Sequence, residues 1–410
     1  MDYGVCGPDI TPLPETADYD ATEISAYITT VLQQLKQEGA YGIFVGLRDN
    51  TGGVVPTFII GVPQVNAPEV ALPPPPQDLP IWVKEDSFIS MPGIGEKWAL
   101  NPVFNPGRIA LEGVSVGIET GSLRGAGSFC GFLKKGSSPG KIFGITAAHC
   151  MPGARTGMAV CSPSTIEVTS RFNRLLRYTT ICPPPDRLHI TQPKQTEVQS
   201  ILQQFRFHEH PAGTTFLGSA DSDQWKTGVL SGQHLGEIVS YNFGSYASLL
   251  HRYDQKLQRL GLRHFFAGRF WETRMDWCIF SCNMDRWLIP LKLQRYGGNI
   301  YEGETVREIG YLYPRAEVEK MGRSTGLQCG KVNPIVLQRW ESGQITCEIA
   351  IIGKDEGFAG TGDSGGCVLV NENGTYKAAG ILIGKTKYTS IAVATPLAMI
   401  LDSAADYWWA

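Results

Sequence analysis

A helical pattern of apolar residues stands near the start of the chain. Between Asp20 and Glu38, apolar side chains recur every three or four residues, the spacing that collects them on one face of a helix: Ile24, Tyr27, Ile28, Val31, Leu32 and Leu35. Asp20 and Glu23 have the spacing of a capping box, and Gly39 supplies a stop signal. We therefore predict a helix over residues 20–38.

Two short apolar runs follow this helix, at residues 42–47 and 57–62. The sequence Asp-Asn-Thr-Gly-Gly at 49–53 favours a turn between them, so the two runs predict a β-hairpin. The sequence Leu-Pro-Pro-Pro-Pro at 72–76 predicts a stiff extended spacer. We assign residues 1–107 to a small α+β N-terminal extension made of the helix, the hairpin and this spacer.

From about residue 108 the pattern changes to short apolar runs broken by glycines. These runs lie at 114–118, 142–148, 349–353, 367–370 and 379–383. Short apolar runs separated by glycines are typical of antiparallel β-sandwiches and barrels. We expect a mainly β domain over residues 108–410. Residues 196–207 and 245–260 carry helical spacing instead, which predicts a partly helical insertion at about 161–270.

Composition narrows the class of protein. Hydrophobic residues make up 42% of the 410 residues, enough for a core, which excludes global disorder. The 36 basic and 39 acidic residues give a net charge of −3, so we expect no nucleic-acid partner. No apolar stretch is long enough for a membrane helix, and the first ten residues lack the pattern of a secretory signal. We expect a cytoplasmic protein whose 10 cysteines are mostly reduced.

Two segments carry candidate chemistry. The sequence Ile-Thr-Ala-Ala-His-Cys at 145–150 is a buried strand that runs into His149, and Gly-Thr-Gly-Asp-Ser-Gly-Gly at 360–366 sets Ser364 among glycines. A serine hydroxyl becomes a nucleophile when a base takes its proton, and histidine is suited to that task near neutral pH. The glycines allow the amides of Gly362 and Ser364 to turn toward one point as an oxyanion hole.

A third residue is needed to orient the histidine and to stabilise its positive charge. Asp276 is the best candidate, because it begins an apolar strand-like run at 276–280. Asp254 lies on the polar face of the predicted helix at 245–260, where we expect it to be solvated. Asp285 follows a turn. These two acids remain the alternatives.

These segments, in the order His, Asp, Ser, resemble the chymotrypsin-like serine peptidases over residues 108–410. The resemblance implies two antiparallel β-barrels with the active site between them. Cys-Gly at 130–131 looks like the family's strand opening, and by resemblance Cys130 and Cys150 would form a disulfide or a thiol pair. The segment 322–330 is similar to that of bacterial streptogrisin-type members. The long insertion and the Asp-Trp at 276–277 are more like large trypsin-like proteins of filamentous fungi.

The resemblance also implies further site residues. Lys320 would pair with Asp363, with Arg323 as the alternative cation. The primary specificity pocket would be lined by Phe358, Ala359, Ile383, Gly384 and Lys385. An apolar floor predicts a preference for small or apolar substrate residues. The chain departs from the family where Glu319 and Phe358 replace cysteines, and where Ile383 replaces a serine that binds the catalytic acid.

Several other features have plainer interpretations. The sequence His-Glu-His at 208–210 lacks a third ligand, so we expect no metal and no cofactor. Cysteines 278, 282, 329 and 347 lack zinc-ligand spacing and are expected to be free core thiols. The terminal Tyr-Trp-Trp at 407–409 is expected to pack on the chain's own barrel.

The sequence therefore predicts a serine endopeptidase that acts on peptides or proteins through an acyl-enzyme. The alternative from another class is a catalytically degenerate protease fold that serves as a protein–protein interaction module. A third interpretation keeps the chemistry but restricts it to cleavage of the chain itself. The oligomeric state and the role of residues 1–107 stay open.

Overall fold

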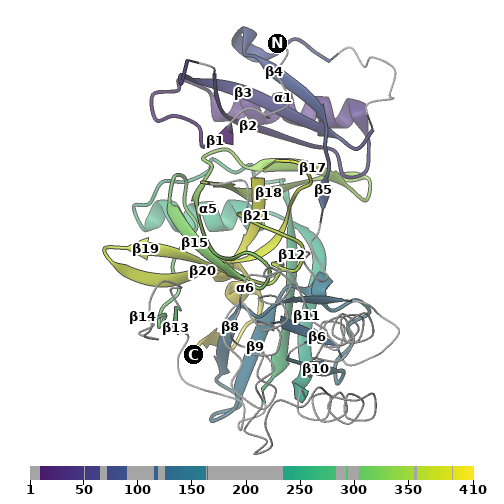
Figure 1. The fold of residues 1–410 in the computed structure, drawn as a ribbon, viewed down its shortest axis with the longest axis vertical. Coiled ribbons are helices and arrows are strands. Elements are labelled where there is room, and N and C mark those ends of the chain that lie inside the picture. The colour runs from purple at the N-terminus through teal and green to yellow at the C-terminus, as the bar shows by residue number, and fades with distance from the viewer. Residues whose placement is uncertain are drawn as a thin grey trace, which may run out of the picture.

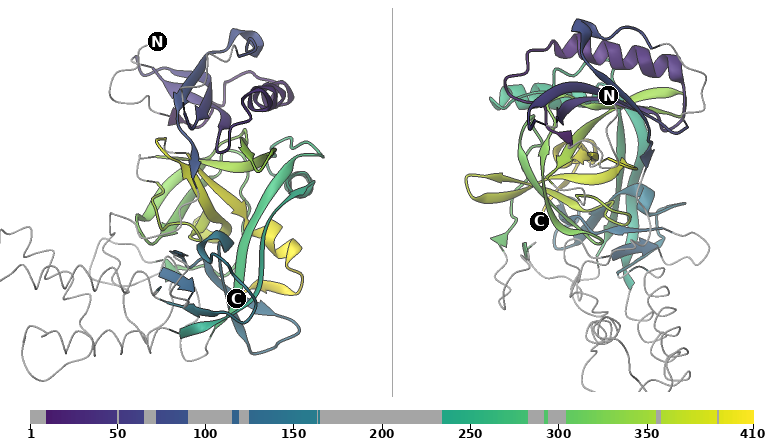
Figure 2. Two further views of the ribbon diagram at one scale, coloured as in Figure 1. Left: turned by 90° about the vertical axis from the view of Figure 1, so that its right-hand side faces the viewer. Right: turned by 45° about the horizontal axis from the view of Figure 1, so that its top comes forward.

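The computed structural model describes residues 10–49, 51–64, 72–89, 115–118, 125–162, 164, 234–282, 292–293, 304–354, 358–389 and 391–410. Figures 1 and 2 show three parts stacked along the long axis: an N-terminal unit, a central group of strands, and a lower group. The described residues are mainly β, as the sequence predicts. The helices are α1 (Ala21–Leu35), η1 (Pro76–Asp78), η2 (Ala148–Cys150), α5 (Leu249–Arg259) and α6 (Leu397–Ser403).

The strands, in chain order, are β1 (Ile10–Thr11), β2 (Tyr41–Arg48), β3 (Val54–Val62), β4 (Ile81–Glu85), β5 (Phe88–Ile89), β6 (Ser115–Ile118), β7 (Ala126–Ser128), β8 (Gly131–Lys135), β9 (Ile142–Thr146), β10 (Ala159–Cys161), β11 (His234–Ala247), β12 (Glu272–Ser281), β13 (Lys292–Leu293), β14 (Glu304–Thr305), β15 (Glu317–Gly322), β16 (Gly326–Val332), β17 (Leu337–Glu341), β18 (Gln344–Gly353), β19 (Cys367–Glu372), β20 (Thr375–Thr386), β21 (Ile391–Pro396) and β22 (Tyr407–Trp409).

The N-terminal unit forms the predicted helix and hairpin. The Asp20 carboxylate caps α1 by accepting hydrogen bonds from the amides of Thr22 and Glu23. Strands β2 and β3 pair as an antiparallel hairpin, and β4 adds to β3 in parallel. The apolar face of α1 packs on this sheet around Ile28, which closely approaches Gly42 of β2.

The N-terminal unit is continuous with the central strands. Strand β2 pairs with β17, so one sheet crosses from the unit into the body. Asn333 is fully buried at this junction, where its side-chain amide donates to the Phe44 carbonyl and its oxygen accepts the Leu13 amide. The Gln338 side chain likewise donates to the Ser25 carbonyl of α1. Buried polar groups with such partners fix the unit in one orientation.

The central strands follow a closed order of antiparallel pairing. Strand β15 pairs with β16, then the ladder continues through β18, β21, β20 and β19, which pairs back with β15. Because a closed order leaves no free edge along the paired segments, these strands enclose a common core.

The lower strands form a second ladder in the order β7, β6, β10, β11, β12, β9, β8 and β22. Its interior holds a separate apolar cluster that includes Phe129, Phe132 and Phe280. The terminal Trp409 is buried and donates its indole N–H to the Val306 carbonyl, so the 407–409 segment packs against the body of the chain.

The segment predicted as a partly helical insertion differs in part from expectation. The helix α5 lies inside the predicted range 245–260, whereas residues 196–207 fall outside the described residues. Strand β11 belongs to the lower ladder, because it pairs with β12 over most of its length. Asp254 of α5 is buried rather than solvated, since its carboxylate accepts the amides of Phe265 and Ala267.

Candidate active site

Strand register brings His149 and Asp276 together. Strand β9 ends just before the turn η2, which carries His149. Strand β9 pairs with β12, and Thr146 of β9 lies opposite Cys278 of β12. Asp276 therefore lies beside η2 although it is 127 residues away in the chain. Its Oδ2 lies 2.6 Å from His149 Nδ1, and its Oδ1 accepts the His149 main-chain N–H at 3.0 Å.

Electrostatics in this pair favour the charged forms. Burial alone would lower the pKa of His149, but the Asp276 charge, aided by Cys150, raises it to about 10. Burial would raise the pKa of Asp276, but the His149 charge and hydrogen bonds keep it below its usual value. The side chains are 5% and 2% exposed. Each charge of the pair therefore stabilises the other against the effect of burial.

Ser364 lies in a tight turn between β18 and β19. Gly362 and Gly365 flank the Asp-Ser dipeptide with φ of 96° and 87°, values that favour glycine. A Cβ at Gly365 would also lie 2.3 Å from the Ser128 carbonyl oxygen, so the turn has no room for a side chain there. Ser364 has no exposed surface, and its Oγ donates to the Ile383 carbonyl at 3.5 Å.

The Cys150 thiol connects the histidine turn to the serine turn. Its Sγ lies 3.7 Å from His149 Nε2 and 3.5 Å from the Ser364 carbonyl oxygen. Cys150 Sγ is thus a common neighbour of His149 Nε2 and of the Ser364 main chain. The structure brings all three predicted residues, His149, Asp276 and Ser364, to one region.

Ser128, at the end of β7, is a site residue that the sequence analysis missed. Its Oγ donates to the Gly362 carbonyl at 2.9 Å and accepts the Arg323 amide at 2.9 Å. Its main-chain N–H donates to the Ser364 carbonyl at 2.6 Å. Ser128 therefore holds the turn around the nucleophile on both sides. No local pattern marks it, because the partners of its hydroxyl lie 195 and 234 residues away in the chain.

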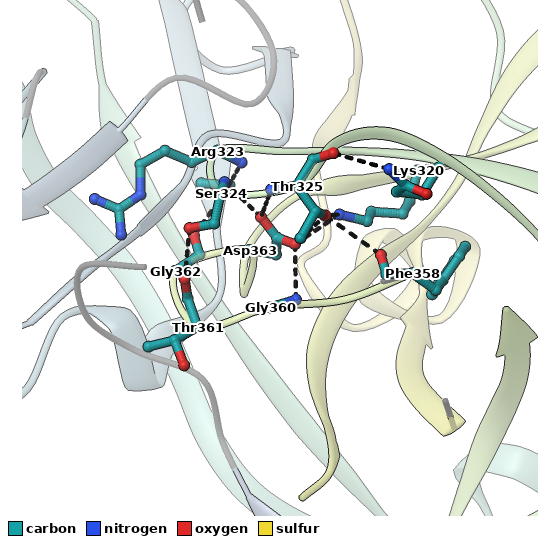
Figure 3. Close-up of polar contacts among 11 residues, drawn as sticks. Lys320, Arg323, Ser324, Thr325, Phe358, Gly360, Thr361, Gly362 and Asp363 are labelled. Carbon is teal, nitrogen blue, oxygen red and sulfur yellow. Dashed lines mark hydrogen bonds and ion pairs between the residues drawn. The ribbon is translucent and has the colours of Figure 1, made fainter. Parts of the chain in front are cut away.

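Asp363 and Lys320 form a fully buried ion pair, drawn in Figure 3. Lys320 Nζ lies 2.6 Å from Asp363 Oδ2, which also accepts the Thr325 hydroxyl and the Gly360 amide. Asp363 Oδ1 accepts the amides of Ser324 and Thr325. This set of donors leaves neither carboxylate oxygen without a partner.

The pKa shifts of the pair follow from burial and mutual attraction. Burial would raise the pKa of Asp363, but the Lys320 charge and the Thr325 hydroxyl hold it below its usual value. Burial lowers the pKa of Lys320, and the Asp363 charge offsets part of that shift. Arg323, the alternative cation, points its guanidinium away from Asp363 (Figure 3).

The predicted pocket residues lie around the same turn. Phe358, Ala359 and Ile383 are buried, and Lys320 Nζ lies 5.9 Å from the centre of the Phe358 ring. Lys385 is partly buried, and its burial lowers its pKa against the opposing effect of the Asp363 and Asp86 charges. The residues predicted to line the pocket thus combine apolar side chains with a second cation, Lys385, beside Lys320.

The structure bears on part of the cysteine prediction. Cys130 and Cys150 are both buried thiols, so no disulfide joins them, and their pairing as thiols stays a prediction. Cys130 is a hydrogen-bond partner of Cys367, an interaction that, with burial, raises the pKa of the Cys367 thiol. The sequence analysis did not foresee that β19 brings this third buried thiol beside Cys130. Cysteines 278, 282, 329 and 347 form no disulfide; three of them are buried as predicted, but Cys329 is exposed and is not a core thiol.

Asp254, one of the two alternative acids, makes its contacts away from this site. Asp254 fixes the loop after α5 and lies 3.5 Å from His264 Nδ1 rather than near His149. Asp285 and the 208–210 segment fall outside the described residues. Within the described ranges, no group of three or more His, Cys, Asp or Glu side chains is placed to hold a metal ion. Among those same ranges, no helix is long and apolar enough to cross a membrane.

No protein-family model and no curated protein matches the chain. Among solved structures, it is similar to a glutamic acid-specific serine protease that uses a histidine triad in substrate binding. That match has 12% identity and a TM-score of 0.36, and it covers 72% of this chain and 97% of that one.

Two further solved structures are similar at the same level. Thermobifida fusca protease A matches with 13% identity and a TM-score of 0.36 over 74% of this chain and 100% of that chain. Nocardiopsis protease matches with 13% identity and a TM-score of 0.33 over 72% and 95%. The function proposed below rests on the contacts around His149 and Ser364.

Proposed function

We propose that the protein is a chymotrypsin-like serine endopeptidase with two β-barrels and the residues His149, Asp276 and Ser364 as its triad. The observation that carries this proposal is the double contact of Asp276 with His149, through the main-chain N–H and through ring Nδ1. A carboxylate bonded in this way fixes the histidine tautomer and leaves Nε2 to exchange protons with a nucleophile.

The reaction follows from these positions. His149 Nε2, in its neutral form, accepts the Ser364 Oγ proton while Oγ attacks the scissile carbonyl carbon. The amides of Gly362 and Ser364 donate to the resulting oxyanion. Asp276 stabilises the imidazolium, which then gives its proton to the leaving amine, so that an acyl-enzyme remains. A water molecule then attacks the acyl carbon while His149 accepts its proton. The bond to Ser364 Oγ breaks, Oγ regains the proton, and the carboxylic acid product leaves.

The substrate would be an extended peptide with a small or apolar residue before the cleaved bond. The buried side chains of Phe358 and Ile383 offer no carboxylate to a substrate cation, and the Lys385 cation would repel one. No metal or cofactor takes part in these steps.

One observation favours the second candidate, a protease fold that binds a protein partner without cleaving it. Ser364 is 0% exposed, so the proposed nucleophile is covered. A closed site of this kind cannot reach a substrate until it opens.

A fluorophosphonate probe discriminates between the two candidates, because it reacts only with an activated serine. The purified full chain would be labelled across pH 6 to 10, with Ser364→Ala as the control. Since only neutral His149 is a base, labelling should increase with pH toward the pKa of about 10. Labelling that is absent at every pH, or that persists in Ser364→Ala, would reject the peptidase.

A further inference from the structure

The edge of β20 beside Ser364 is where an extended peptide would bind. Ile383 of β20 accepts the Ser364 hydroxyl, so a peptide whose carbonyl reaches Ser364 Oγ must lie along this strand. Strand β19 covers β20 from Thr375 to Ile381, and Gly365 and Gly366 hydrogen-bond to Leu382, so the edge is open to another strand from Ile383 onward. Peptides commonly add to such open edges through main-chain hydrogen bonds.

In this structure, β5 of the N-terminal unit already occupies the open edge. Ile89 pairs with Lys385 and Phe88 with Thr386 in antiparallel register, and the Lys387 amide donates to the Ser87 carbonyl at 2.9 Å. In Figure 1, β5 reaches from the N-terminal unit into the central strands. Because β5 runs antiparallel to β20, its chain direction leads toward Ile383 and Ser364. A bound peptide in antiparallel pairing would have the same direction.

The spacing between Ile383 and Lys385 along β20 sets how long a peptide can be before it collides with β5. Lys385 follows Ile383 by two residues, which is roughly 7 Å at the rise of a β-strand. A substrate that extends more than about two residues on the amino-terminal side of the cleaved bond would therefore meet Ile89.

Side chains hold β5 in place. The Phe88 ring lies between Gly384, where a Cβ would be 2.3 Å from the ring, and the Arg339 guanidinium, 4.2 Å from the ring centre. Asp86, which is 1% exposed, accepts the Tyr41 hydroxyl at 2.8 Å and the Tyr388 amide at 3.0 Å. The carboxylate thus ties the start of this segment both to β2 and to the loop after β20.

We propose that residues 86–89 form an autoinhibitory strand, which blocks the peptide-binding edge of β20 and must leave it before an extended substrate can bind. The inhibition of peptide cleavage rests on the proposed function. The occupied edge itself is independent of whether Ser364 is a nucleophile.

A reversible cross-link tests the proposal directly. Phe88→Cys with Thr386→Cys places two thiols on opposite residues of an antiparallel pair, where Cα atoms lie within disulfide range. In the Ser364→Ala background, binding of a fluorescein-labelled hexapeptide of alanine and leucine would be measured by anisotropy before and after reduction. We expect binding at least about tenfold weaker in the oxidised form. Equal binding in both forms would overturn the proposal.

Two further measurements separate this proposal from the proposed function. With Ser364 intact, oxidised and reduced forms should react equally with the small fluorophosphonate, while hexapeptide cleavage should recover only on reduction. The variant Phe88→Ala, which weakens the hold on β5, should cleave the hexapeptide faster than the parent. The matched control Val55→Ala, at an exposed position of β3 in the same unit, should not. If no form is labelled by the fluorophosphonate, the proposed peptidase function is rejected. Whether residues 86–89 block peptide binding is decided by the anisotropy measurement alone.

Discussion

Lys320 Nζ lies 2.6 Å from Asp363 Oδ2, and neither side chain has any exposed surface. Asp363 directly precedes the proposed nucleophile in the chain, and its carboxylate fixes the turn by accepting the amides of Gly360, Ser324 and Thr325. Lys320 thus supplies from within the folded chain the cation that this buried carboxylate needs.

Removal of Lys320 should therefore damage both stability and turnover. Lys320→Ala leaves the Asp363 carboxylate buried without its charge partner, which costs about 3–5 kcal/mol of unfolding free energy. Lys377→Ala is a matched control, because Lys377 pairs with Glu308 and Glu372 at the surface, where such pairs contribute about 0–1 kcal/mol. Denaturant unfolding of both variants checks the difference, and equal losses would contradict the assigned role.

The nucleophile and its base should behave as one unit. Ser364→Ala and His149→Ala should each abolish most peptidase activity, and the double variant should be scarcely slower than either. Steady-state cleavage of an apolar peptide checks this. Losses that add up in the double variant would show that the two side chains act independently.

Asp276→Asn should lower the pKa of His149 and reduce the rate at the same time. The Asp276 charge opposes burial and raises that pKa to about 10, so without the charge burial lowers it. The alkaline rise of fluorophosphonate labelling should move to lower pH, while kcat falls roughly a thousandfold or more because the imidazolium loses its partner. Asp254→Asn, a buried acid that holds another loop, should leave the pH profile in place.

Ser128→Ala should lower kcat more than it raises KM. The hydroxyl of Ser128 orients the Gly362 carbonyl, and with it the amide expected to bind the oxyanion, while the substrate-binding edge lies elsewhere. Loss of one oriented donor costs roughly a hundredfold in kcat. Ser115→Ala removes another buried hydroxyl, which pairs with Ser164, and serves as the control for folding. A change in KM alone would refute the positioning role.

Peptides with arginine or lysine before the cleaved bond should be poor substrates. Phe358 and Ala359 present no negative charge, and Lys385 adds a positive one, so the desolvation of a substrate cation would not be offset. A peptide-library profile checks this prediction. Cleavage dominated by basic residues would show that the pocket lies elsewhere.

The amino-acid sequence by itself determined the local elements and the chemically distinctive residues. The helical spacing of the apolar residues after Asp20, together with its capping carboxylate, predicted α1, and turn residues at 49–53 predicted the hairpin of β2 and β3. The glycines around Ser364 signalled a tight turn, which the positive φ of Gly362 and Gly365 requires. These signals are local, because propensity, capping and turn geometry depend on neighbouring residues.

Only the tertiary structure decided which distant residues meet. Asp276 reaches His149 through the register of β9 and β12, whereas Asp254, on the polar face of a helix, is buried by its own loop. Cys130 meets Cys367 because β19 brings that thiol beside it. Ser128 and the pairing of β5 with β20 have no sequence signal. Contacts of this kind depend on strand register and packing across the whole chain, which a linear pattern does not encode.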